Sequence, residues 1–221
     1  MSNYKAAIFD LDGTLINTLE SLAYSMGNTL KSLGLKDIPK EKCREFIGSG
    51  ARLFIERSLE WAGDKDLSLI EKAEKEYFKI FDVYCTYKLE AYQGITALLE
   101  KCKEDGMKLA VFSNKPHNMS IKSVESVFGN GTFDFILGQQ DGKARKPHPD
   151  GIYEILETLE VDIKDAIFIG DSEIDMQTGH NAKIKTVGVT WGFRSVEDLM
   201  KENPETLVNS TEELSEILFT L

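Results

Sequence analysis

The stretch AAIFDLDGTLINT, residues 6 to 18, decides the fold, because a short apolar run ends there in two closely spaced acidic side chains. Residues 6 to 9 are continuously apolar, which is typical of a strand buried on both faces of a parallel sheet. Asp10 and Asp12 follow at once, and residues i and i+2 of an extended segment face the same side. Two like charges at the end of a buried strand need a cation or a shared proton. The stretch therefore predicts a ligand site at the end of the first strand.

Composition and charge narrow the class of protein. The chain has 221 residues, 42% of them hydrophobic, which is enough for a sizeable core. Its net charge of −11, from 37 acidic and 26 basic residues, argues against a general nucleic-acid partner. No apolar run approaches the ~20 residues that span a bilayer, so we expect no membrane partner. The three cysteines are widely spaced without a CxxC pair, and Asp10 interrupts the apolar N-terminal stretch early, so we expect a cytoplasmic protein.

Two kinds of hydrophobic pattern occur along the chain. Apolar residues recur at helical spacing over residues 19–33, 40–47, 53–62 and 68–87, and no convincing strand occurs between residues 14 and 92. Elsewhere, helical segments separate the short apolar runs YKAAIF, MKLAVFS, FDFILG, AIFIG and KTVGVT. Such alternation predicts an α/β fold with a parallel sheet covered on both faces. We expect a core made of residues 1–14 and 93–221, with an all-helical domain inserted at residues 15–92.

Polar side chains follow each of the main predicted strands. Ser113, Asn114 and Lys115 end the second run, Asp171 and Asp175 follow AIFIG, and Lys146 precedes the helix before that strand. Because ligands bind at the carboxyl ends of parallel strands, we expect these side chains to converge with Asp10 and Asp12. Carboxylate oxygens suit Mg²⁺, for which Mn²⁺ could substitute. With the metal and Lys146 present, the cluster would attract a phosphate, to which Ser113 could donate a hydrogen bond. Gly13, Asn114 and Lys115 are further candidates for phosphate or substrate binding.

The spacing of the first acidic pair separates two roles. Asp10, nearest the metal, would be the nucleophile that attacks phosphorus and forms an aspartyl-phosphate. Asp12 would protonate the leaving oxygen and then take a proton from the attacking water. Gly13 lets the backbone turn close to the ligand.

Taken in order, FDLDGT, VFSN, KP and GDSEID resemble the four motifs of the haloacid dehalogenase superfamily, and the similarity covers nearly the whole chain. The resemblance implies a Rossmann-like core with a five-stranded sheet, a helical cap and Mg²⁺-dependent phosphoryl transfer. It implies that the metal is bound by Asp10, by the backbone carbonyl of Asp12, and by the acids of the fourth motif. Asp171 is assigned as a direct ligand, and Asp175 binds either directly or through water.

The substrate stays open among several alternatives. The stretches IGSGARLFIERSL, FSNKP and VGVTWGF are similar to phosphoglycolate phosphatases, so 2-phosphoglycolate is the leading small-metabolite substrate. Asn17, Gln93 and the stretch HNAKIKT depart from that subgroup. Another phosphatase activity, on a sugar phosphate, nucleotide or pyrophosphate, remains open, as do a phosphomutase of the β-phosphoglucomutase type and a catalytically dead binding module.

Alternatives also stay open for the roles of two basic residues and for the oligomeric state. Arg52 could reach the substrate from the cap or start a helix as a solvated side chain, and Lys115 is a second candidate for substrate contact. The protein is expected to act as a monomer or a homodimer.

Overall fold

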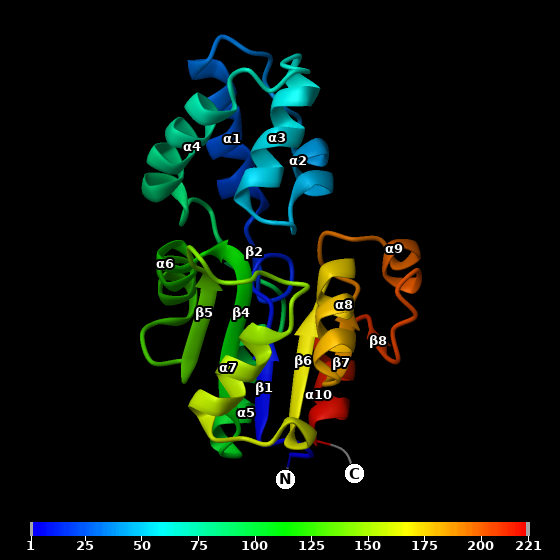
Figure 1. The fold of residues 1–221 in the computed structure, drawn as a ribbon. Coiled ribbons are helices and arrows are strands. Elements are labelled where there is room, and N and C mark those ends of the chain that lie inside the picture. The colour runs from blue at the N-terminus through cyan, green and yellow to red at the C-terminus, as the bar shows by residue number, and fades with distance from the viewer. Residues whose placement is uncertain (1, 220–221) are drawn as a thin grey trace.

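A parallel sheet forms the centre of the structure, a computed structural model that describes residues 2–219 (Figure 1). Within these residues the sheet has six strands in the order β5-β4-β1-β6-β7-β8. Their bounds are β1 (Ala6–Phe9), β4 (Lys108–Pro116), β5 (Phe135–Gln139), β6 (Ala166–Gly170), β7 (Lys185–Val189) and β8 (Leu207–Val208). The predicted α/β fold with a parallel sheet is confirmed, and each of the five apolar runs forms a strand. The sixth, β8, is an edge strand of two residues, too short to leave a hydrophobic pattern.

Helices cover both faces of the sheet. Side chains alternate along β1, so that Ala6 and Ile8 pack on one face and Ala7 and Phe9 on the other. The first face is covered by α7 (Asp150–Leu159) and α8 (Glu173–Ala182), and the second by α5 (Ile95–Glu104), α6 (His117–Phe128) and α10 (Thr211–Phe219). A 3₁₀ turn at Ile163–Asp165 and α9 (Val196–Met200) complete this part. Burial on both faces explains why the central strands are apolar at every position.

A block of four helices, which we call the helical block, follows β1 in the described chain and lies beyond the carboxyl ends of the strands (Figure 1). It consists of α1 (Leu19–Ser32), α2 (Lys40–Phe46), α3 (Ala51–Ala62) and α4 (Ile70–Tyr84). These helices have their own apolar core, which includes Met26, Leu59 and Tyr77.

Two short strands connect the helical block to the sheet. β2 (Ile16–Asn17) pairs antiparallel with β3 (Glu90–Ala91) at the two ends of the inserted segment. The expectation of no strand between residues 14 and 92 is therefore wrong at these ends, since two-residue strands are set by tertiary pairing rather than by a sequence period. The domain boundaries near residues 14 and 93 stay predictions. Among residues 2–219, no helix has the length and apolar character needed to cross a bilayer.

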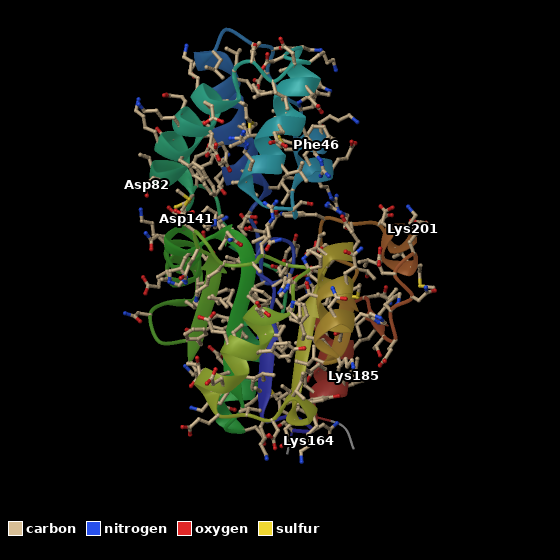
Figure 2. All side chains as sticks on the ribbon, in the orientation of Figure 1. Phe46, Asp82, Asp141, Lys164, Lys185 and Lys201 are labelled. Atoms are coloured by element: carbon tan, nitrogen blue, oxygen red, sulfur yellow. The ribbon has the colours of Figure 1, made fainter. Side chains whose placement is uncertain are left out.

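Contacts on two sides hold the helical block against the rest of the molecule. On one side the guanidinium Nε of Arg44 in α2 donates to the Phe193 carbonyl at 2.9 Å, and Arg194 Nη1 donates back to the Arg44 carbonyl at 3.1 Å. On the other side Lys122 Nζ of α6 lies 2.5 Å from a carboxylate oxygen of Asp82, at the junction seen in Figure 2. These contacts join the helical block to the rest of the molecule on two sides of the strand ends.

Candidate active site

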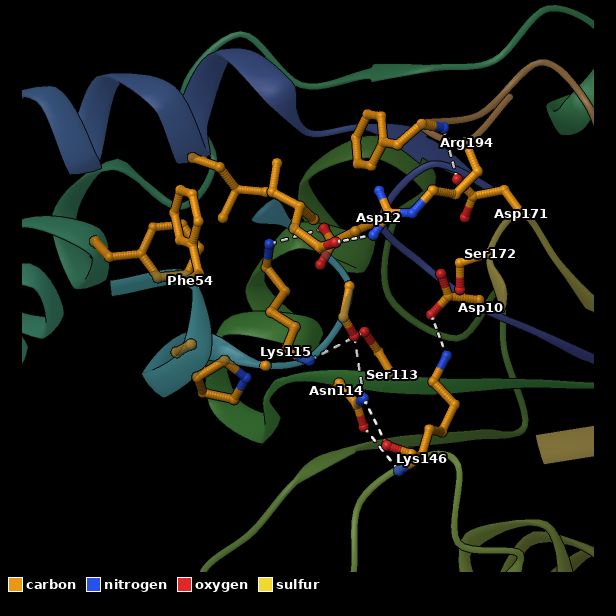
Figure 3. A pocket seen from close by; sticks show the side chains of 18 of the residues that line it. Asp10, Asp12, Phe54, Ser113, Asn114, Lys115, Lys146, Asp171, Ser172 and Arg194 are labelled. Atoms are coloured by element: carbon orange, nitrogen blue, oxygen red, sulfur yellow. Dashed lines mark hydrogen bonds and ion pairs between the residues drawn. The ribbon is translucent and has the colours of Figure 1, made fainter. Parts of the chain in front are cut away.

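A pocket lies where the carboxyl ends of β1, β4 and β6 meet the helical block (Figure 3). Seven of the residues predicted from sequence line it: Asp10, Asp12, Ser113, Asn114, Lys115, Lys146 and Asp171. The helical block contributes an apolar wall that includes Leu22, Ile47, Phe54, Tyr77 and Phe81. Most of the polar residues predicted from sequence thus lie in one pocket, whose apolar side was not predicted.

Gly13 allows the first strand end to approach the fourth motif. Its φ of +99° lies in the region that favours glycine, and a Cβ atom there would sit 2.3 Å from Asp171 Oδ2. Next to it, the Thr14 hydroxyl donates to Asp171 Oδ1 at 3.2 Å. Gly13 therefore serves the close packing of the two motifs, and Thr14 is a residue that the sequence reasoning missed.

Three buried carboxylates form a compact cluster. Asp10, Asp171 and Asp175 each place an oxygen within 4.8 Å of the others. Burial raises the pKa of Asp10 well above its usual value, and the charges of Asp175 and Asp171 raise it further, against the opposing effect of Lys146. Burial, followed by the charge of Asp175, raises the pKa of Asp171 to about 7. Without a cation, the site therefore retains protons that isolated carboxylates would lose.

Lys146 is the cation nearest to this cluster. Its Nζ lies 2.6 Å from Asp10 Oδ1 and 2.7 Å from Asp175 Oδ1, and its side chain is only 3% exposed. One lysine offsets one of three negative charges. The two negative charges that Lys146 does not offset would be stabilised by a further cation.

The Asp175 carboxylate has several partners already. Oδ2 accepts hydrogen bonds from the Ser172 backbone N–H at 3.1 Å and the Ser172 hydroxyl at 2.6 Å, while Oδ1 contacts Lys146. Ser172 and Asp175 also form the capping box at the start of α8. Asp175 is thus held in a fixed orientation beside the other two acids.

Two residues after β4 have different tasks. The Ser113 hydroxyl oxygen accepts from the Lys115 backbone N–H at 3.2 Å, which leaves its proton available to a ligand. The side-chain amide of Asn114 donates to the carbonyls of Gly48 at 3.1 Å and Lys146 at 3.0 Å, and its oxygen accepts from the Lys146 N–H at 2.9 Å. Both amide protons of Asn114 are in use. Its side chain therefore positions Lys146 and the Gly48 loop, a role that the prediction of phosphate binding did not anticipate.

Lys115 forms an ion pair with the second acid of the first motif. Its Nζ lies 2.9 Å from Asp12 Oδ1 and 4.8 Å from the centre of the Phe81 ring. The Lys115 side chain is 1% exposed, so this charge is held inside the pocket (Figure 3).

Arg52 does not join the other predicted residues. Its guanidinium pairs with Glu56 at 3.0 Å, with Glu71 at 3.1 Å and with Glu74, on the surface of α3 and α4. Three carboxylates satisfy the arginine there, and it is not among the residues that line the pocket. This is the solvated alternative, and the placement of Arg52 as a substrate contact is not supported by the structure.

The loop after β7 contributes contacts that the sequence reasoning missed. The Phe193 backbone N–H donates to Asp171 Oδ2 at 2.6 Å, and Arg194 Nε lies 2.8 Å from Glu173 Oε2. A Cβ on Gly192 would lie 2.3 Å from Asp171. The stretch VGVTWGF contains Gly192 and Phe193, but Phe193 acts through its backbone N–H and Gly192 through its lack of a Cβ, so neither residue type indicates the contact. The role of the stretch comes from where the fold places it.

Comparison with known proteins agrees with this geometry. A family model described as haloacid dehalogenase-like hydrolase matches residues 7–189. A phosphoglycolate phosphatase of Haemophilus influenzae is 33% identical over 223 residues, which cover 98% of this chain and 99% of that protein.

Solved structures agree as well. The crystal structure of a Lactobacillus delbrueckii subsp. bulgaricus protein, assigned provisionally as a phosphoglycolate phosphatase, has a TM-score of 0.90 at 33% identity, covering 99% of both chains. A predicted phosphoglycolate phosphatase of Haemophilus somnus has a TM-score of 0.89 at 28% identity, covering 98% of this chain and 99% of that one. Together with the carboxylate cluster and Lys146, these findings show that the chain belongs to the haloacid dehalogenase-like hydrolases and is a phosphoric monoester hydrolase.

Proposed function

We propose that the enzyme hydrolyses the phosphomonoester of a small metabolite through an aspartyl-phosphate on Asp10, with Mg²⁺ as cofactor and 2-phosphoglycolate as the leading substrate. The observation that carries the proposal is the buried cluster of Asp10, Asp171 and Asp175, bridged by Lys146 at the end of β1. An acidic site of this kind binds a phosphate only with added positive charge.

The donor set fits a hard divalent cation. Three carboxylates offer oxygen atoms within 4.8 Å of one another, and no cysteine or histidine belongs to the group found among the described residues. Asp10, Asp171 and the backbone carbonyl of Asp12 would hold Mg²⁺, or Mn²⁺ in its place. Both oxygens of Asp175 already have protein partners, and Asp175 would bind the metal either directly or through a water molecule. When bound, the metal would neutralise the cluster and polarise the phosphoryl group.

The chain's own residues account for the two chemical steps. A carboxylate oxygen of Asp10 forms a bond to phosphorus while the bond from phosphorus to the ester oxygen breaks, and the Asp12 carboxyl donates a proton to that leaving oxygen. In the second step, Asp12 accepts a proton from water as the water oxygen bonds to phosphorus and the bond to Asp10 breaks. Lys146 and the Ser113 hydroxyl hold the phosphoryl oxygens during both steps. The helical block excludes other water from the pocket.

The leading substrate rests on the relatives. Full-length relatives at 31–33% identity carry the name phosphoglycolate phosphatase, and the pocket between the helical block and the strand ends suits a small leaving group. A phosphomutase would use the same aspartyl-phosphate but return the phosphoryl group to another hydroxyl of a sugar. The two activities differ in whether inorganic phosphate is released.

A panel of phosphomonoesters, assayed for inorganic phosphate with Mg²⁺ and with EDTA, tests the proposal. We expect turnover with Mg²⁺, its loss in EDTA, and the highest kcat/KM for 2-phosphoglycolate. The Asp10→Asn variant serves as the matched inactive control. Isomerised hexose phosphate without phosphate release would favour the mutase, and no turnover of any substrate would favour a binding module.

A further inference from the structure

The half of the pocket that faces the helical block is apolar. Its wall is built from Leu22, Ile47, Phe54, Tyr77, Phe81 and Phe193. A leaving group attached to a phosphate on Asp10 would extend into this half. Polar atoms that project into such surroundings are strong determinants of specificity, because water does not screen them.

Lys115 supplies a positive charge to this apolar half. An ammonium group has three donors, and among residues 2–219 its hydrogen-bond partner is a single oxygen, Asp12 Oδ1 at 2.9 Å. The remaining protons make no hydrogen bond within the described chain, although the side chain is 99% buried; besides Asp12, the ammonium group contacts the face of the Phe81 ring, 4.8 Å from its centre. By contrast, Lys146 is shared by two carboxylates, and Arg194 is held by Glu173 and two backbone carbonyls.

Tyr77 of α4 adds a second donor to this apolar half of the pocket. Its ring stacks on Phe81 with centroids 5.2 Å apart, and the residue lines the pocket at 1% exposure. Its hydroxyl makes no hydrogen bond within the described residues. Burial raises the pKa of Tyr77 well above its usual value, so the phenol keeps its proton and remains a donor.

From these positions we infer that Lys115 and Tyr77 form a subsite for an anionic group on the leaving group, and that the enzyme selects phosphomonoesters whose leaving group carries a carboxylate. A carboxylate has two oxygens, one for the free protons of Lys115 and one for the Tyr77 hydroxyl. In the absence of substrate, the Asp12 carboxylate occupies part of this place. The inference rests on the proposed phosphatase function and assigns its specificity to two residues.

The experiment compares two substrates of the same length. In 2-phosphoglycolate the carbon next to the phosphoryloxy methylene is a carboxylate, and in 2-hydroxyethyl phosphate it is a neutral hydroxymethyl group. The specificity ratio is kcat/KM for the first divided by kcat/KM for the second. Any effect of a substitution on Asp12 or on phosphate binding is common to both substrates and cancels in this ratio.

We expect Lys115→Met to lower the specificity ratio by about tenfold to a hundredfold, the range for one charge-assisted hydrogen bond. Tyr77→Phe, which removes only the hydroxyl, lowers it by about twofold to tenfold. Lys108→Met is the matched control, because Lys108 lies at the other end of β4 and also pairs with one aspartate at 2.9 Å, outside the pocket. It leaves the ratio unchanged.

A wild-type ratio near one, or an unchanged ratio in folded Lys115→Met, overturns the inference. Equal losses on both substrates would assign Lys115 to Asp12 or to the phosphate alone, which also overturns it. If the wild-type enzyme releases no phosphate from any monoester, the proposed function itself fails. The inference then falls with it, and this failure is told apart from the others because no phosphate is released from any substrate.

Discussion

The acidic cluster predicts that Mg²⁺ stabilises the protein far more at pH 8 than at pH 5.5. The pKa of Asp171 is raised from 3.8 to about 7 by burial and by Asp175. Between these two values the metal-free folded protein holds a proton that the unfolded chain releases. Its stability therefore falls as the pH rises through this window. Mg²⁺ replaces that proton, so its contribution grows over the same range.

The magnitude follows from the size of the shift. Each pH unit corresponds to about 1.4 kcal/mol per proton, so the titration of Asp171 alone costs the metal-free protein about 4 kcal/mol between pH 4 and pH 7. At pH 8, Mg²⁺ at a hundred times its dissociation constant adds about 2.7 kcal/mol. At pH 5.5 a proton on Asp171 lowers the metal affinity by roughly thirtyfold, and the same Mg²⁺ concentration adds under about 1 kcal/mol. For a chain of this length, the shifts in Tm are about 5–10 °C and 2–4 °C.

Thermal unfolding in EDTA and in Mg²⁺, recorded from pH 5 to pH 8, measures both quantities. Asp171→Asn is the control, because it removes the titrating group and the proposed metal ligand together. We expect it to flatten the metal-dependent gain. A gain from Mg²⁺ that is equal at pH 5.5 and pH 8, or one that persists in Asp171→Asn, would refute the reasoning.

Three further substitutions separate the roles assigned to other residues. Arg52→Gln should change kcat/KM less than about twofold, because Arg52 lies outside the pocket and solvent screens its ion pairs at the surface. A large loss of activity would return Arg52 to the site. Gly192→Ala should weaken Mg²⁺ binding and destabilise the fold by about 1–3 kcal/mol, because the added Cβ would lie 2.3 Å from Asp171. Titration calorimetry measures the Mg²⁺ affinity and urea unfolding measures the stability. An unchanged Mg²⁺ affinity would argue against the close contact. Arg194→Gln should lower kcat/KM about tenfold and make the helical block easier to cleave by protease, because the hydrogen bonds of Arg194 to the Arg44 and Ile47 carbonyls are lost. Wild-type rates and wild-type protection from protease would show that these hydrogen bonds do not hold the helical block in place.

The strand-end acids were predictable because their positions follow from local rules. An apolar run of four residues followed by Asp10 and Asp12 identifies a buried strand and the edge at which it ends. The same rule places Ser113 and Asp171 at that edge, since parallel strands share one direction. For this reason the sheet and the acidic cluster could be derived before any contact was known.

The rest depends on contacts between segments far apart in the sequence. The hydrogen bonds of Asn114 depend on the fold placing the Gly48 and Lys146 carbonyls beside it. The pairing of Arg52 with Glu71 and Glu74 depends on how α3 packs on α4. Strands of two residues, such as β8, carry no period of their own. The Phe193 N–H that binds Asp171 is a backbone group, which every residue except proline possesses. The residue types alone therefore do not indicate these contacts.

The central claim is that Asp10 carries the phosphoryl group during turnover, and its most direct test is a phosphoryl-labelling experiment. Enzyme with Mg²⁺ is mixed with ³²P-labelled substrate and quenched in acid, and the labelled peptide is identified. We predict label on the peptide that contains Asp10, absent from Asp10→Asn. Phosphate release by an enzyme that never becomes labelled, or label on another residue, would contradict the account.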